Sequence, residues 1–121
     1  MLKIYFDVLT EPIPKLYETL MKRVIRAAVN EHYPNHRFEV NVTVCDDETI
    51  RQINSEHRGI DRPTDVLSFP MLGEDTSPAS SPVMLGDIVL SLEKAIEQGE
   101  EFGHGYEREL AFLCIHSTLH L

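Results

Sequence analysis

Two histidines near the end of the chain have the spacing of a metal-binding pair. His116 and His120 stand four residues apart in the segment IHSTLHL, which is predicted to be helical. Side chains at positions i and i+4 of a helix lie on one face, with Cβ atoms roughly 6 Å apart, so both imidazoles can reach one ion. The same HxxxH spacing recurs in zinc enzymes. The alternative is structural, with one histidine capping helix carbonyls and the other merely packed.

The neighbours of the histidine pair limit its chemistry. Ser117 occupies the position at which HExxH zinc proteases carry a glutamate base, so peptide hydrolysis by that mechanism is disfavoured. Cys114 lies about 200° around the helix from His116 and is expected to face away. A catalytic zinc ion uses three protein ligands and an open position for water. His104 has no spacing that demands a role, so the third ligand is expected just after Leu121.

A second concentration of reactive groups lies in the segment HRGIDRPTD. Arg58 and Arg62 flank Gly59 and Asp61 there. A guanidinium group binds phosphate through paired hydrogen bonds and does not deprotonate, so an arginine held near a metal would stabilise charge on a phosphoryl group. The alternative is an exposed polar turn in which Thr64 or Asp65 makes local backbone bonds.

Composition excludes several classes of protein. The chain has 121 residues, and its 11 Lys and Arg against 20 Asp and Glu give a net charge of −9, the wrong sign for a protein that binds nucleic acid over a broad basic surface. Its apolar runs are too short to span a membrane, and its first residues lack the pattern of a signal peptide, so a cytoplasmic location is expected. The two cysteines, Cys45 and Cys114, are interpreted as reduced core residues.

Hydrophobic periodicity predicts four strands and four helices in the order βαβαββαα. Alternation predicts strands at 2–8, 37–44, 66–69 and 86–91, and helical spacing predicts helices at 14–31, 46–57, from 92 to the glycines near 103, and from 106 onward. Asp46 and Ser91 are predicted N-caps. Lys22, Arg23 and Arg26 lie on the polar face of the first helix, as a solvated surface or a binding patch.

These elements predict an α/β (α+β) fold: one domain over 1–121, with a mixed, mostly parallel four-stranded sheet packed with helices. Seven apolar strand residues are expected to be buried, namely Val40, Val42, Val44, Val66, Leu67, Ile88 and Leu90. The segment 73–82 is rich in Ser, Pro and acids and is expected to be a mobile surface loop.

Three separated blocks together resemble one family. INSEHRGIDRPTDVLSFP, LGDIVLSLEKA and EFGHGYERELAFLCIHSTLHL are similar, in order and spacing, to the YbeY family of bacterial metal-dependent endoribonucleases. The family signature runs past its second histidine through a glycine-containing turn to an aspartate and a third histidine. This chain carries the start of that signature, with Ser117 where glycine is usual, and is interpreted as a member truncated at the C-terminus, lacking the family's C-terminal tail.

The resemblance implies a function and its site. It implies a zinc-dependent endoribonuclease, a hydrolase specific for single-stranded RNA that matures the 3′ end of small-subunit ribosomal RNA and serves ribosome quality control. His116 and His120 would be two of three ligands of one Zn²⁺ ion, with the third histidine beyond Leu121, and zinc binding by this chain would be weak or absent. Arg58 would be catalytic. The implied partners are ribosomal RNA, a small-subunit ribosomal protein and a ribosome-assembly GTPase, with no membrane.

Two other functions stay open at this point. The charge of −9 suits a ribosome-assembly binding factor that has little nuclease activity of its own and depends on its partners for RNA contact. A metal hydrolase of small phosphoesters would use the same residue types.

Overall fold

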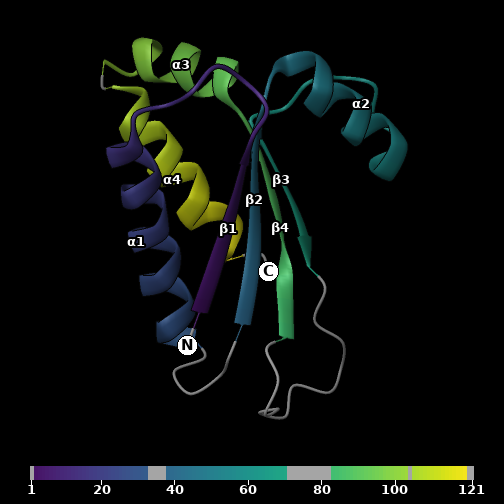
Figure 1. Ribbon diagram of the computed structural model, residues 1–121. Coiled ribbons are helices and arrows are strands. Elements are labelled where there is room, and N and C mark those ends of the chain that lie inside the picture. Colours follow the sequence, from purple (N-terminus) through teal and green to yellow (C-terminus); the bar gives the residue numbers. More distant parts are fainter. Residues whose placement is uncertain (1, 33–37, 71–82, 104, 120–121) are drawn as a thin grey trace.

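The computed structural model describes residues 2–32, 38–70, 83–103 and 105–119, apart from the side chains of 32 and 83. The elements are β1 (Leu2–Val8), α1 (Lys15–His32), β2 (Phe38–Cys45), α2 (Asp47–Arg58), β3 (Val66–Pro70), β4 (Val83–Ser91), α3 (Leu92–Glu101) and α4 (Tyr106–Thr118). The predicted order is therefore confirmed, and the chain forms a single α/β domain (Figure 1). The predicted loop at 73–82 falls outside the described residues.

The sheet has the order β1-β2-β4-β3. β1 and β4 both pair with β2 in parallel, whereas β3 pairs with β4 in the antiparallel direction. The mixed, mostly parallel sheet predicted from the sequence is thus confirmed. β1 and β3 are its two edges, and β4 begins three residues before the predicted start at 86.

One face of the sheet carries the main core. Alternate residues of β2 point to this face and are fully buried, namely Val40, Val42 and Val44. They meet Met21, Ile25 and Val29, which recur every four residues along α1, and residues of α3 and α4 complete the layer. In Figure 1 α1 and α4 lie together on this side, and both run from the top of the view toward the bottom.

The opposite face is covered in part by α2 alone. A smaller apolar cluster forms there from Cys45, Ile50, Leu67 and Val89, with Ile53 and Phe69 packed beside it. The prediction that Leu67 is buried is confirmed, but Val66 is only half-buried, because β3 is an edge strand with no neighbour on its outer side. Among the described residues, no other helix covers this face.

Both predicted caps are present. The carboxylate of Asp46 accepts a hydrogen bond of 2.8 Å from the backbone N–H of Thr49. The hydroxyl of Ser91 accepts one of 3.2 Å from the N–H of Lys94, and the same hydroxyl donates to Asp47 over 2.6 Å. Ser91 thereby joins the start of α3 to the start of α2.

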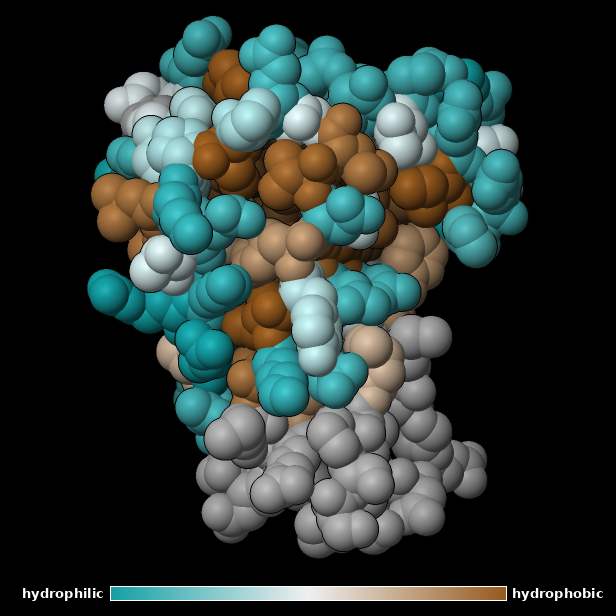
Figure 2. Space-filling model, viewed as in Figure 1, coloured by the Kyte–Doolittle hydropathy of each residue, from teal (hydrophilic) through white to brown (hydrophobic). Residues whose placement is uncertain are grey.

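The face of the molecule shown in Figure 2 carries many hydrophilic residues, in keeping with the charge of −9. Figure 2 shows apolar residues gathered in the middle of the upper part of one face, between hydrophilic residues on either side. Within the described ranges, no helix has the length and apolar character needed to cross a membrane.

Candidate functional site

Arg58 is the last residue of α2, and its side chain is exposed. Gly59 ends the helix in the left-handed conformation, with φ of 69°, a geometry that glycine adopts without a steric penalty. In the part of the chain that the structure describes, Arg58 forms no salt bridge. With respect to the described residues, its guanidinium group is therefore available for an external anion.

The loop after Arg58 is anchored from within α2. The amide of the buried Asn54 donates to the backbone carbonyl of Arg62 over 2.9 Å. Arg51 pairs with both Glu48 and Asp61, and the hydrogen bonds to Glu48 and then Asp61 raise the pKa of Arg51 above its ordinary value. The ion pair between Arg51 and Asp61 thus holds the loop against α2. Arg51 has a structural role, whereas Arg58 has no such ion pair among the described residues.

His116 lies in the last turn of α4, on its exposed side. Its imidazole stacks on the ring of Phe112, with centroids 6.2 Å apart and an interplanar angle of 9°. Cys114 is fully buried, which confirms that it faces away from His116. Burial raises the pKa of Cys114 to about 12 and that of Cys45 to about 11, so both are inert core thiols, as predicted.

Ser117 is fully buried against the sheet. Its carbonyl accepts a 3.3 Å hydrogen bond from the hydroxyl of Ser68 on β3, and the two hydroxyls also contact each other. Ser117, which follows His116, therefore packs α4 against β3. This agrees with the interpretation that Ser117 supplies no catalytic base.

β3 connects the two predicted functional regions. Leu67 and Phe69 face α2, and the ring of Phe69 contacts the imidazole of His57, with centroids 5.4 Å apart. Ser68 points the other way, to α4. α2 and α4 thus pack against the edge strand from its two opposite faces. That Arg58 and His116 line one cleft with His120 stays a prediction, since His120 lies outside the described residues.

The described residues supply one exposed candidate ligand for a metal ion. The exposed imidazole of His116 suits a zinc ligand chemically. However, no three His, Cys, Asp or Glu side chains in the described ranges are grouped closely enough to hold a metal ion. α4 ends at Thr118 with Leu119 as its C-cap, so His120 and the implied third histidine are both outside the region described. The described residues fit a zinc site only to the extent of His116.

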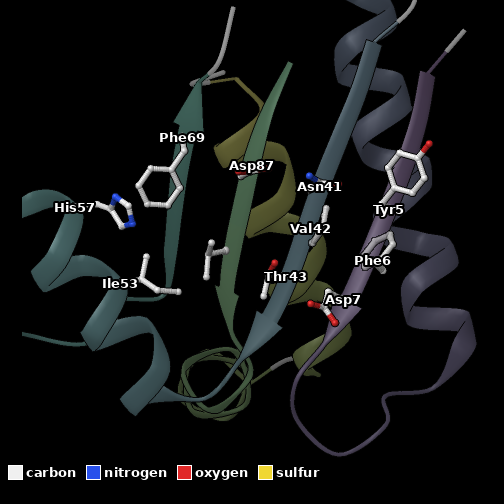
Figure 3. Close-up of a pocket in the computed structure, with 11 residues that line it drawn as sticks. Tyr5, Phe6, Asp7, Asn41, Val42, Thr43, Ile53, His57, Phe69 and Asp87 are labelled. Carbon is white, nitrogen blue, oxygen red and sulfur yellow. The ribbon is translucent and has the colours of Figure 1, made fainter. Parts of the chain in front are cut away.

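The open face of the sheet carries a groove of about 620 Å³ that sequence analysis missed. Figure 3 shows its floor, formed by neighbouring strands, and the side chains of Ile53 and His57 on α2 at one side. The register sets Tyr5, Asn41, Asp87 and Phe69 in one row across the four strands. The signal was present in the polar positions that alternate with buried residues along β1, β2 and β4.

The chemistry of this sheet-face groove is acidic. Among the described residues, its lining contains the carboxylates of Asp7 and Asp87 and no Lys or Arg. One oxygen of Asp87 is buried and has no hydrogen-bond partner among the described residues. The groove therefore suits hydrogen-bond donors and cations, and it repels phosphate.

Comparison with known proteins identifies the class to which this fold and site belong. The model of the family described as Endoribonuclease YbeY matches residues 6–121, and the chain belongs to that family. The match includes both Arg58 and the histidine helix.

Individual relatives agree with this assignment. The chain is 46% identical to Endoribonuclease YbeY of Agathobacter rectalis over 87% of its own length and 73% of the relative's. It is 43% identical to Endoribonuclease YbeY of Bacillus cereus strain G9842, over 93% of this chain and 75% of that protein. The solution structure of TM1509 from Thermotoga maritima superposes with a TM-score of 0.63 at 29% identity, covering all of this chain and 71% of that one.

Proposed function

We propose that this protein is a zinc-dependent endoribonuclease that cuts single-stranded RNA during maturation of the 3′ end of small-subunit ribosomal RNA. The observation that carries the proposal is the family match over 6–121, whose relatives are named endoribonucleases. A cytoplasmic location, a role in ribosome quality control, and contacts with a small-subunit ribosomal protein and an assembly GTPase belong to the same proposal.

In this proposal, residues of α4 would hold the metal ion and a residue of α2 would bind the substrate phosphate. His116 and His120 would hold the zinc ion from α4, together with a third histidine beyond Leu121, and zinc bound there would supply a Lewis acid that lowers the pKa of a bound water. Arg58 would bind the phosphate of the scissile bond, because its exposed guanidinium lacks a salt bridge within the described ranges. It would also offset the negative charge that develops on the phosphoryl oxygens.

β3 contacts the ends of both helices, from opposite faces of the sheet. His57, next to Arg58, contacts Phe69, and Ser117, next to His116, contacts Ser68. A single short strand thereby fixes the ends of both functional helices. Small displacements of a catalytic group carry a large cost in rate, so a rigid support of this kind suits catalysis.

The acidic groove favours a second candidate, a ribosome-assembly factor with little nuclease activity of its own. The lining with Asp7 and Asp87 and without Lys or Arg suits a basic segment of a protein partner rather than RNA. In this case Arg58 and His116 would be dispensable for the biological role.

Complementation of cells that lack the protein separates these two functions. Arg58→Ala and His116→Ala are expressed separately from a complete coding sequence, with the exposed Arg23→Ala as the matched control. If the protein acts as the nuclease, cells with either site variant should accumulate small-subunit RNA with unprocessed 3′ ends, and cells with the control variant should have normal ends. Normal processing with both site variants, at unchanged protein levels, would contradict the enzyme and favour the assembly factor.

A further inference from the structure

The positive charges of α1 are divided by the fold between two surfaces. Lys22 and Arg26 are four residues apart, with Asn30 four residues further, so the three lie in one row along the helix. Lys22 stands over the ring of Phe6 on β1, 5.6 Å from its centroid, which directs this row toward the first strand. Arg23 instead lines a separate cavity beside Glu107 and Arg108.

A basic groove runs between this row and the first edge of the sheet. It encloses about 570 Å³ and is lined by Leu2, Lys3, Ile4, Tyr5, Arg26 and Asn30. Lys3 and Arg26 supply two positive charges, and none of the described residues in the lining is acidic. Glu39, the register neighbour of Lys3 on β2, is not part of it. In the region described, neither Lys3, Lys22 nor Arg26 forms a salt bridge.

Tyr5 lies at the boundary between the two grooves. It lines both the basic groove and the acidic sheet-face groove, and its side chain is 47% exposed. β1 is also an edge strand among the described residues, and an edge strand presents backbone groups that no neighbouring strand pairs. A positively charged groove beside an exposed aromatic ring is the arrangement by which proteins bind single-stranded nucleic acid: cations follow the backbone and a base stacks on the ring.

We infer that the groove between β1 and α1 binds single-stranded RNA, with Lys3 and Arg26 on its phosphates and Tyr5 stacked on a base. This inference rests on the proposed function and locates part of its substrate path. It also resolves the conflict between RNA binding and a net charge of −9, because the local charge of this groove is opposite to that of the whole protein. α1 packs on α4, so the groove lies on the helix next to the one that carries His116.

Fluorescence anisotropy with a labelled single-stranded RNA of mixed sequence tests the inference. The 121-residue chain is compared with Lys3→Gln/Arg26→Gln and with the matched control Lys15→Gln/Arg23→Gln, which removes the same charge from α1 outside the groove. Each phosphate contact contributes about 0.7 to the slope of log affinity against log salt, so the groove variant is expected to lose about 1.4 of that slope. Its affinity should fall at least about fivefold, while the control keeps the wild-type slope.

A second pair of variants isolates the stacking contact. Tyr5→Ala should weaken RNA binding, whereas Tyr5→Phe, which keeps the ring, should preserve it. Equal affinities and slopes for the two charge variants would overturn the inference and leave the free edge of β1 for another partner, such as a peptide that adds a strand.

The binding result and the catalytic result are independent. Groove-dependent binding by the 121-residue chain, together with no cleavage by the zinc-loaded chain that includes the third histidine, would support the inference and contradict the proposed nuclease. If the wild-type protein cleaves RNA but the groove variant binds RNA as tightly as the wild type, the proposed nuclease is supported and the inference about the groove is contradicted. Absence of RNA binding by the wild-type chain would overturn the inference whatever the result of the cleavage assay.

Discussion

The hydroxyl of Ser68 on β3 donates a 3.3 Å hydrogen bond to the carbonyl of Ser117 on α4, and the two hydroxyl groups touch. Ser117 is fully buried at this contact, and the next residue toward the N-terminus is His116. The contact therefore fixes the turn of α4 that presents the predicted metal ligand. It also explains why a small residue is needed there, since a larger side chain would push the helix off the strand.

Removing either hydroxyl should weaken the attachment of α4 to β3. Ser68→Ala and Ser117→Ala are each expected to lower the free energy of unfolding by about 0.5–1.5 kcal/mol, the net value of a typical hydrogen bond. Urea unfolding of both single variants and the double variant measures their coupling. Strictly additive losses would show that the two hydroxyls do not interact in solution.

The core on the helical face should be sensitive to truncation. Val42 is fully buried at the centre of β2, so Val42→Ala should lower the free energy of unfolding by about 1–3 kcal/mol. Leu16, which is 73% exposed, provides the control, and Leu16→Ala should change it by less than about 0.5 kcal/mol. Urea unfolding giving equal effects at the two positions would contradict the assignment of this face as the core.

The N-cap of α2 should make stability depend on pH. The hydrogen bond from Thr49 lowers the pKa of Asp46 below its ordinary value. A lowered pKa in the folded state means that the ionised carboxylate stabilises the fold above its unfolded-state pKa, and that this contribution is lost as the pH falls through the folded-state pKa. Asp46→Asn keeps a capping acceptor but cannot titrate.

Thermal unfolding of the wild type and Asp46→Asn between pH 7 and pH 2 measures this contribution. The melting temperature of the wild type should fall more steeply with acidification, and the difference between the two proteins should narrow or reverse at the acidic end. Parallel curves over the whole range would show that the cap does not contribute through its charge.

The two thiols should be unreactive in the folded protein. Burial raises the pKa values of Cys45 and Cys114 to about 11 and about 12, so neither is a thiolate at pH 8. A colorimetric thiol assay should detect almost no reaction in buffer and two thiols per chain in urea. Rapid reaction of one or more thiols per chain in the native protein would contradict the buried placement of these side chains.

The sequence was sufficient to predict the order of elements because each has a strong local signal. β2 alternates fully buried valines with half-buried polar residues, and Asp46 and Ser91 precede their helices as caps. The side of the sheet taken by α2 depends on long-range packing of Ile50 and Leu67, which no local pattern encodes. β3 extends one residue past its predicted end at 69, to Pro70, since an edge strand tolerates a residue that lacks an N–H.

The sequence predicts those features of the site that depend on residues close together in the chain. It does not predict those that depend on contacts between distant segments. The spacing of His116 and His120 is local, and the exposure of His116 agrees with a ligand role. The basic groove depends on β1 and α1 coming together, which places Lys3 and Arg26 in the lining of one groove although they are far apart in sequence. The polar residues of the sheet-face groove resemble an ordinary solvated strand face until the register aligns them.

Zinc-dependent cleavage of single-stranded RNA is the most direct test of the central claim. The protein is produced with the chain extended through the third histidine that the family resemblance implies, and its metal is removed. Zinc is then added stepwise, and cleavage of an end-labelled RNA is measured at each concentration. We predict that cleavage rises with zinc to saturation, is lost in His116→Ala and in His120→Ala, falls by about 10²–10³ in Arg58→Ala, and is unchanged in Arg23→Ala. Cleavage that persists without zinc, or in both histidine variants, would contradict the account.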